Sequence, residues 1–256
     1  MQTRRKIAVA GATGRVSRHI VDILESGGHD VVAMSRTTGV DVITGDGLAG
    51  ALDGVEAIVD AATGPSPDQQ AAAEFFTTAA RNLQQAGAEA GVERIVVVSI
   101  IGADRFRAGY NVAKVAHEQA LLAGPVPARV LRAAQFHELV GLLMEWGNRG
   151  DVIYVPNMRT QPVAARTVAQ ELAELAVDSE WAPADEPPRE IAGPRVESLV
   201  EMARLLAARR GDSSRVEGVS NPDDPDRELF EQGGLLPGPN AKLAGPTFEA
   251  WLDEAS

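Results

Sequence analysis

Tyr110 and Lys114 are the two residues of this sequence whose types and spacing are best suited to acid–base chemistry. The chain has 2 tyrosines and 3 lysines among 256 residues, so a pair four positions apart has little chance of arising by accident. Positions four apart share one face of a helix. An ammonium group beside a phenol lowers a pKa that starts near ~10, which brings a tyrosine closer to the range of a useful acid or base. The pair predicts a catalytic site, and the alternative is an ordinary solvated helix.

A glycine-rich turn, Gly11-Ala12-Thr13-Gly14, follows an apolar run near the amino terminus and precedes an amphipathic segment. Gly11 permits the tight turn, and Gly14 lets the backbone approach a pyrophosphate, whose charge the amides and dipole of a helix start favour. Ser17 replaces the third glycine of the dinucleotide-binding fingerprint, at a helix-packing position where a small residue suffices. The turn therefore predicts cofactor binding by Gly11, Thr13, Gly14, Arg15 and Val16.

The end of the second predicted strand, Met34-Ser35-Arg36, indicates which cofactor is preferred. An NAD-selective site carries an acid there for the ribose hydroxyls, whereas Ser35 and Arg36 supply a hydroxyl and a bidentate cation for a 2′-phosphate, and Arg15 is near the same region. NADP is therefore favoured over NAD, unless Arg36 is only a surface residue. Further cofactor-binding residues are expected in the turns that line the adenine and ribose: Asp46, Ala61, Ala62 and Thr63.

The elements that position these residues are short β-branched runs that alternate with amphipathic segments. The predicted strands are residues 7–10, 31–34, 42–44, 57–61, 95–99 and 129–131, and the first two helical segments are residues 16–24 and 67–91. Buried strands joined through helices indicate a parallel sheet with right-handed crossovers, covered on both faces. We predict an α/β fold, a doubly wound parallel sheet (Rossmann fold), with Tyr110 and Lys114 facing the crevice at its carboxyl edge.

The pattern loosens after residue 150, where we place the boundary between a dinucleotide-binding Rossmann core (1–150) and a small substrate-binding lobe (151–256) packed on the same domain. In this lobe we expect a strand at 152–155, helices at 167–177 and 196–209, and a Pro- and Glu-rich loop at 181–194. The last thirty residues contain several Gly and Pro residues and are expected to be mostly irregular.

Taken together, these motifs resemble the short-chain dehydrogenase/reductase superfamily, and more narrowly its atypical, NmrA-like branch. The resemblance covers nearly the whole chain and rests on the glycine turn, Arg36, Gly45-Asp46, Ser99 at the end of a strand, and Tyr110-x-x-x-Lys114 on the following helix. It implies that Tyr110 is the catalytic acid, that Ser99 polarises the substrate oxygen and that Lys114 also holds the nicotinamide ribose. Members of the branch include oxidoreductases, isomerases and redox sensors that catalyse nothing.

Substrate contacts are expected after the sixth predicted strand, because ligands of open α/β sheets lie outside the carboxyl ends of the strands. A lone histidine there is more often structural, and Met144 more often belongs to a core. The other histidines lack metal-ligand spacing, so no metal site is predicted. The candidate substrate residues are Gln135, Phe136, His137 and Trp146.

Composition limits the partners. The formal net charge of −12 repels nucleic acid and anionic membrane surfaces, and no apolar run approaches the ~20 residues of a membrane span. The absence of cysteine removes disulfides and thiolate sites, so a reducing cytoplasm is the simplest location.

The sequence thus predicts a cytoplasmic NAD(P)-dependent oxidoreductase, with NADP favoured. It would transfer hydride between the nicotinamide and a small organic carbonyl or alcohol, or an activated double bond, with a Ser-Tyr-Lys site. The alternatives are an epimerase or dehydratase with tightly held cofactor, and a cofactor-binding redox sensor without catalysis. Sensors can dispense with the Tyr and Lys pair, which is present here.

Overall fold

The computed structural model describes residues 4–180 and 187–254, and the chain forms two compact units. The first comprises Met1–Ser99, Gly109–Arg132 and Val168–Arg189, and the second comprises Ile100–Ala108, Ala133–Thr167 and Glu190–Ser256. Both units are discontinuous in sequence. Residues 133–150, which we assigned to the nucleotide-binding core, therefore belong to the second unit, and most of the helix predicted at 167–177 belongs to the first.

The first unit is built on a parallel sheet. Its strands are β1 (Lys6–Ala10), β2 (Asp30–Met34), β3 (Ala57–Asp60), β4 (Arg94–Ile100) and β5 (Ala128–Ala133). Strand β1 pairs in parallel with β2 and with β3, and β3 pairs in parallel with β4. With β8 (Arg189–Ala192) and β11 (Lys242–Leu243), the sheet in the described part of the chain has seven strands in the order β11-β8-β5-β4-β3-β1-β2. The order reverses between β1 and β3, which is the kind of position where open α/β sheets bind ligands.

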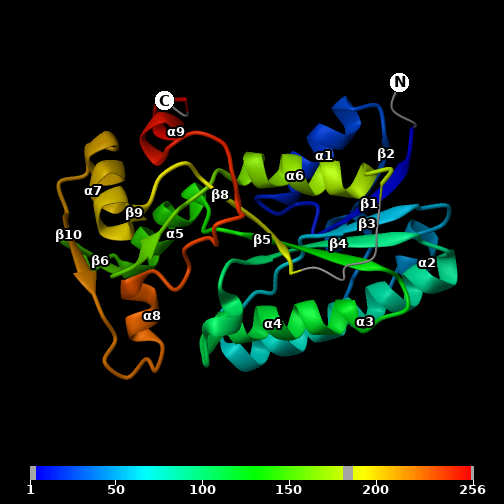
Figure 1. Ribbon diagram of the computed structural model, residues 1–256, viewed down its shortest axis with the longest axis horizontal. Coiled ribbons are helices and arrows are strands. Elements are labelled where there is room, and N and C mark those ends of the chain that lie inside the picture. The colour runs from blue at the N-terminus through cyan, green and yellow to red at the C-terminus, as the bar shows by residue number, and fades with distance from the viewer. Residues whose placement is uncertain (1–3, 181–186, 255–256) are drawn as a thin grey trace. The chain divides into compact units, whose positions relative to one another are not determined.

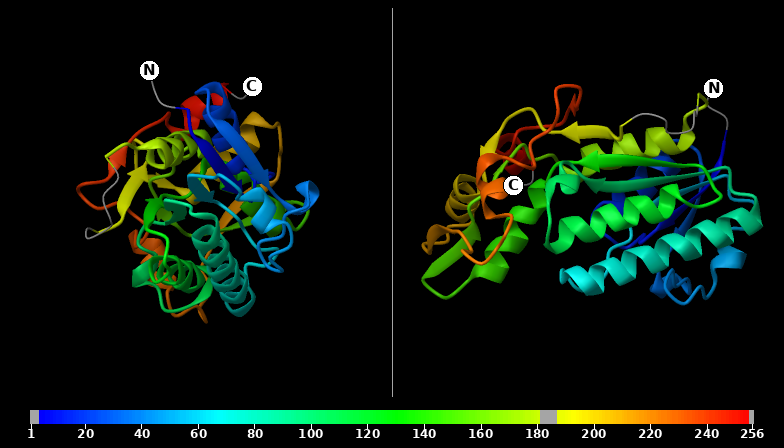
Figure 2. Two further views of the ribbon diagram at one scale, coloured as in Figure 1. Left: turned by 90° about the vertical axis from the view of Figure 1, so that its right-hand side faces the viewer. Right: turned by 60° about the horizontal axis from the view of Figure 1, so that its bottom comes forward.

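Helices cover both faces of this sheet, so the predicted doubly wound α/β fold is confirmed. Helices α1 (Ser17–Ser26) and α6 (Ala165–Val177) lie on one face, and α3 (Gln69–Ala90) and α4 (Gly109–Leu122) lie side by side on the other (Figures 1 and 2). The Asp68 side chain accepts a hydrogen bond from the Ala71 amide at the start of α3, and Gly91 ends that helix in the left-handed conformation. None of the helices in the described part of the chain is both long and apolar enough to span a membrane.

The strand predicted at residues 42–44 is wrong, because these residues form a turn instead. The Asp41 carboxylate accepts hydrogen bonds from the amides of Ile43 at 2.7 Å and Thr44 at 3.4 Å, and Gly45 adopts a positive φ of 84°. This local side-chain-to-backbone bonding competes with strand pairing. The turn lies between two short helices, η1 (Arg36–Thr38) and α2 (Leu48–Ala51).

The second unit has its own apolar core, formed largely by α5 (His137–Gly147), α7 (Leu199–Arg209) and the parallel pair β6 (Val152–Pro156) and β10 (Arg215–Val219). It also contains β7 (Arg159–Thr160) paired antiparallel with β9 (Glu197–Ser198), and β8 (Arg189–Ala192) paired parallel with β11 (Lys242–Leu243). The remaining elements are η2 (Ala103–Arg105), α8 (Arg227–Gln232) and α9 (Phe248–Glu254).

Two sequence predictions for this part of the chain need correction. The loop expected at 181–194 contains strand β8, while residues 181–186 lie outside the described part. The last thirty residues contain α8, α9 and β11, so they are less irregular than expected. Gly and Pro fall between these short elements, where they permit turns without excluding the helices.

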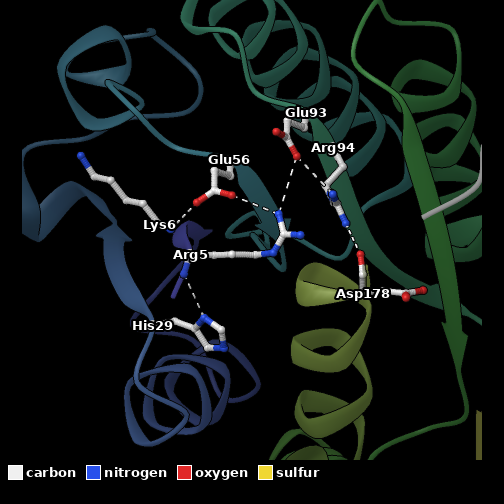
Figure 3. Close-up of polar contacts among 7 residues, drawn as sticks. All are labelled: Arg5, Lys6, His29, Glu56, Glu93, Arg94 and Asp178. Atoms are coloured by element: carbon white, nitrogen blue, oxygen red, sulfur yellow. Dashed lines mark hydrogen bonds and ion pairs between the residues drawn. The ribbon is translucent and has the colours of Figure 1, made fainter. Parts of the chain in front are cut away.

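At the amino edge of the first unit's sheet, charged side chains pair with one another (Figure 3). The guanidinium of Arg5 lies 3.0 Å from a Glu56 carboxylate oxygen and 3.7 Å from Glu93. Arg94 lies 3.1 Å from Glu93 and donates a hydrogen bond to the backbone carbonyl of Asp178. These residues precede or begin parallel strands, or follow helix α6, so the sheet geometry brings them to one edge.

Candidate active site

The glycine turn at the end of β1 is held in a shape that only glycine fits at its first position. Gly11 has a φ of +72°, and a Cβ added there would lie 2.7 Å from the Cα of Ala62 in the loop after β3. The turn is closed by hydrogen bonds from the Gly14 amide to the Gly11 carbonyl at 2.8 Å and from the Ala12 amide to the Met34 carbonyl at 3.1 Å. The ends of β1, β2 and β3 therefore meet at this turn.

Ser17 begins helix α1 directly behind the turn and is fully buried. A Cβ added at Gly14 would lie 3.4 Å from the Ser17 hydroxyl, so the two residues are closely packed. The small side chain at this position thus fits the helix-packing role that we expected for the third residue of the fingerprint.

Two exposed arginines flank the turn. Within residues 4–180 and 187–254, the structure gives the guanidinium groups of Arg15 and Arg36 no hydrogen bond and no ion pair. The Ser35 hydroxyl lies 2.8 Å from that of Thr37, and the η1 helix begins directly after it. Backbone amides of a glycine turn can bind the phosphates of a dinucleotide, and guanidinium groups bind phosphate in bidentate fashion. The turn and the two arginines therefore fit such a ligand.

The other predicted cofactor residues lie in two different loops. Ala61, Ala62 and Thr63 follow β3 and adjoin Gly11 through Ala62, as their placement after a strand predicts. Asp46 is exposed in the turn held by Asp41, where its backbone carbonyl accepts a hydrogen bond from the Asp41 amide at 2.9 Å.

Tyr110 is half-buried near the start of α4, and its hydroxyl lies 3.5 Å from that of Thr63. Its ring packs edge-on against Phe76 of α3, with 5.6 Å between the ring centroids. Burial raises the pKa of Tyr110, and the hydrogen bond with Thr63 only partly opposes this shift. Our expectation that Lys114 lowers this pKa is therefore wrong, because desolvation dominates.

Lys114 lies one helical turn further along α4, but its ammonium group is bound by other protein groups and not by Tyr110. Its Nζ donates to the Val98 carbonyl at 2.8 Å, lies 3.0 Å from His117 Nδ1 and sits 4.4 Å from the centre of the Phe76 ring. Burial lowers the pKa of Lys114 to about 8, against the opposing charges of Asp60 and Glu118. Because Val98 precedes Ser99, Lys114 is fixed against the end of β4.

His117 and Asp60 extend this contact into a buried chain of polar groups. His117 Nε2 lies 2.8 Å from Asp60 Oδ2, and Asp60 Oδ1 accepts a hydrogen bond from the Ala62 amide at 3.0 Å. Burial and the nearby Lys114 charge lower the pKa of His117, so it is neutral near pH 7. Burial opposes ionisation of Asp60, but the interactions with His117 and Ala62 outweigh it and lower the pKa of Asp60.

The sequence analysis did not identify Asp60, His117 or Phe76 as part of the site. A signal existed for the first two. Asp60 is an acid at the end of the apolar strand β3, and His117 lies three positions after Lys114, on the same helix face. Nothing in the sequence distinguished Phe76, whose ring stacks on His117 with 4.7 Å between centroids.

Ser99 lies near the end of β4 with only 3% of its surface exposed. Its hydroxyl has no hydrogen-bond partner among the residues that the structure describes. Buried hydroxyls are normally paired, so an unpaired one at the carboxyl edge of a sheet is suited to a ligand.

All four candidate substrate residues belong to the second unit. Gln135 accepts a hydrogen bond from the Thr160 hydroxyl, and Phe136 is half-buried. His137 packs against the rings of Phe248 and Trp251, and its Nε2 lies 3.2 Å from the Pro246 carbonyl. Burial lowers the pKa of His137, against this hydrogen bond. Met144 belongs to the unit's core, as expected, whereas Trp146 is 55% exposed.

Comparisons with known proteins agree with this arrangement. Residues 11–135 match the family model described as NAD(P)H-binding. No match to the sequence is found among curated proteins.

Solved structures share the fold at low sequence identity. The enzyme WbmG of Bordetella bronchiseptica, in complex with NAD and UDP, is 16% identical with a TM-score of 0.70, over 99% of this chain and 96% of that one. An Agrobacterium tumefaciens protein of the short-chain dehydrogenase/reductase superfamily, with bound NAD, is 18% identical with a TM-score of 0.67, over 98% and 95%. The Escherichia coli NADPH-dependent quinone oxidoreductase QOR2, with NADPH, is 18% identical with a TM-score of 0.67, over 98% and 100%. Residues 11–135 are therefore similar to an NAD(P)H-binding domain, and the chain shares the fold of these solved proteins.

Proposed function

We propose that this protein is an NADP-dependent oxidoreductase that transfers hydride to a small organic carbonyl compound or an activated double bond. The observation that carries the proposal is the position of Tyr110 and Lys114 within the NAD(P)H-binding domain. The phenol is held 3.5 Å from Thr63 in the loop after β3, and the lysine one turn later binds the carbonyl next to Ser99. A proposed proton donor, Tyr110, thus lies beside the loop after β3, and a buried hydroxyl, Ser99, lies near the end of β4.

In this proposal the dinucleotide supplies the hydride when it is bound. Tyr110 gives its phenolic proton to the substrate oxygen, and its raised pKa keeps that proton in place at neutral pH. The Ser99 hydroxyl donates to the same oxygen and orients it. Lys114, whose ammonium group the Val98 carbonyl and His117 hold in place, binds the nicotinamide ribose.

The preference for NADP rests on charge at the end of β2. Arg36 and Arg15 are exposed, have no ion-pair partner within the described ranges, and could pair with a 2′-phosphate. Residues 35–40, which directly follow β2, include no acidic side chain to repel that phosphate. The other proposed cofactor contacts are the glycine turn, Asp46 and the loop 61–63.

The proposed substrate is a small organic molecule, and Gln135, Phe136 and Trp146 are the residues proposed to contact it. His137 is better explained as part of that unit's aromatic core, because it packs on Phe248 and Trp251. A cytoplasmic location completes the proposal, since the chain has no cysteine that an oxidising compartment would cross-link.

A cofactor-binding sensor is the second candidate, and one observation favours it. The Lys114 ammonium is surrounded by the Val98 carbonyl, the His117 imidazole and the Phe76 ring, so the protein itself satisfies the group that catalysis would use.

Deuterium transfer distinguishes the two functions. The protein is mixed with NADPH deuterated at the transferring position and with a panel of quinones, aldehydes and ketones, and the products are analysed by mass spectrometry. Deuterium in a product, absent in Tyr110→Phe, supports the oxidoreductase. Tight NADPH binding with no transfer to any compound and none in single turnovers would favour the sensor.

A further inference from the structure

Lys114, His117 and Asp60 form an unbroken chain of buried polar side chains that joins α4 to the end of β3. Their exposed fractions are 5%, 1% and 0%. The distances along the chain are 3.0 Å from Lys114 Nζ to His117 Nδ1 and 2.8 Å from His117 Nε2 to Asp60 Oδ2. The second carboxylate oxygen accepts the Ala62 amide, so the chain ends on the loop that touches Gly11.

Hydrogen-bonding rules fix the protons of this chain. An ammonium group can only donate, so the Nδ1 that faces Lys114 must carry a lone pair. The other nitrogen of a neutral imidazole then carries the hydrogen, and Nε2 donates to the ionised Asp60 carboxylate. The three groups together carry one positive and one negative charge, which makes their burial tolerable.

We infer that Asp60 and His117 are positioning residues for Lys114, in which Asp60 fixes the tautomer of His117 and the His117 Nδ1 lone pair fixes the Lys114 ammonium group. The inference deepens the proposed function, because it rests on the role assigned there to Lys114. Two of the three ammonium hydrogens are directed at Val98 O and His117 Nδ1, so the nitrogen cannot swing with the freedom of a surface lysine.

The surroundings of Lys114 support this assignment. Phe76 stacks on His117, lies under the Lys114 ammonium and contacts the edge of Tyr110, so one ring aligns three groups of the site. Glu118 is the other acid near Lys114, and its carboxylate is engaged by Arg132 of β5 at 3.0 and 2.8 Å. Asp60 is thus the acid that reaches Lys114 through a hydrogen-bonded partner.

The first test reads the protons directly on the whole protein. The chain has 4 histidines and 3 lysines, so nitrogen-15 NMR of labelled imidazole and ammonium groups gives few signals, which His117→Gln and Lys114→Arg assign. We expect His117 to show an unprotonated Nδ1 and a protonated Nε2 at pH 7, and Lys114 to titrate near its lowered pKa of about 8. The opposite tautomer, or a Lys114 that titrates as the other lysines do, would overturn the inference.

The second test uses variants that keep the shape of the site. His117→Phe keeps a ring against Phe76 but removes the acceptor, so the Lys114 pKa should fall further, by ~1. His117→Gln restores an acceptor oxygen and should recover part of this change. The matched control is His29→Gln at the opposite edge of the sheet, where His29 Nδ1 accepts the Arg5 amide at 3.3 Å. An unchanged Lys114 titration in His117→Phe contradicts the inference.

Failure of the proposed function gives a different result. If the wild-type protein transfers no deuterium from NADPH but the NMR titrations follow the pattern above, the positioning chain exists and the oxidoreductase proposal fails. If deuterium transfer occurs and the Lys114 pKa is the same in wild type and His117→Phe, the oxidoreductase proposal stands and the positioning inference is overturned. Asp60→Asn removes the carboxylate that selects the tautomer of His117, so the tautomer seen by NMR tests the same chain. If the Asp60→Asn protein does not fold, the wild-type spectrum still tests the inference.

Discussion

Both edges of the first unit's sheet carry polar and charged side chains, but those at the amino edge are paired with one another and several at the carboxyl edge are not. At the amino edge, Arg5 and Arg94 are paired with Glu56 and Glu93, and the backbone of Asp178 accepts a further hydrogen bond (Figure 3). At the carboxyl edge, the Ser99 hydroxyl has no partner in the described part of the chain, and Arg15 and Arg36 are exposed there without an ion pair.

The difference distinguishes groups that stabilise the fold from groups that we propose bind a ligand. Polar groups that a protein buries are usually satisfied within it, and the charged groups of the amino edge pair with one another. A buried hydroxyl without a partner costs folding free energy, and exposed cations without an ion pair add little to it, so we propose that Ser99, Arg15 and Arg36 serve ligand binding. The chain of Lys114, His117 and Asp60 differs from both groups. Its members are hydrogen-bonded to one another, and yet the pKa of each is shifted from its usual value.

The largest effect should come from the Tyr110 phenol. Tyr110→Phe keeps the ring contact with Phe76 and removes only the proton donor, so folding and NADPH affinity should persist while single-turnover hydride transfer falls by about 10² to 10⁴. Tyr154→Phe, in the second unit, is the matched control and should leave the rate unchanged. Equal rates of hydride transfer for Tyr110→Phe and wild type would show that Tyr110, like the charged residues of the amino edge, has only a structural role.

The buried Lys114 predicts a pH dependence of stability. Its pKa is lowered from 10.5 to about 8 in the folded state, so between these values the unfolded chain binds more protons, and stability rises with pH. The contribution reaches about 3 kcal/mol at high pH, because a pKa difference of one between the two states corresponds to ~1.4 kcal/mol. Urea unfolding at several pH values should show this rise in wild type, and the difference curve against Lys114→Met should isolate it from the titration of the tyrosines. A flat difference curve contradicts a buried, perturbed lysine.

Arg36 should set the cofactor preference. Wild type should bind NADPH more tightly than NADH, and Arg36→Ala should remove most of the difference, a change of about 1.5 to 3 kcal/mol for a charge-assisted contact. Calorimetry with both cofactors measures this change. Arg18→Ala, an exposed arginine of α1, serves as the control and should preserve the preference. Stronger NADH binding by wild type would reverse the assignment.

The sequence predicted the elements that obey simple periodicity. The strands near residues 7–10, 31–34, 57–61 and 95–99 and the helices near 16–24 and 67–91 are present, because apolar runs and glycine stops decide them locally. The strand at 42–44 failed, since the Asp41 carboxylate bonds the following amides before a partner strand is involved.

The site could be predicted only in part for a different reason. The positions of Gly11 and Arg36 follow from strand ends, but the surroundings of Lys114 depend on α3 and β3, which are distant in sequence. The direction in which the Tyr110 pKa moves depends on how completely its ring is buried, and no spacing rule gives that burial.

The smallest effect is expected from a substitution at the amino edge, which should change the stability of the fold and not cofactor binding. Glu56 pairs with Arg5 and accepts the Lys6 amide at 3.1 Å, but its side chain is 37% exposed. Glu56→Gln keeps an acceptor and loses the charge, so the free energy of unfolding should fall by only ~0.2 to 1 kcal/mol, the usual range for an exposed pair. NADPH affinity should not change, because the proposed cofactor residues lie at the other ends of the strands. Urea unfolding and calorimetry on the same preparation measure both quantities. A loss of NADPH affinity comparable to that of Arg36→Ala, at intact stability, would show that the two edges are not separate in function.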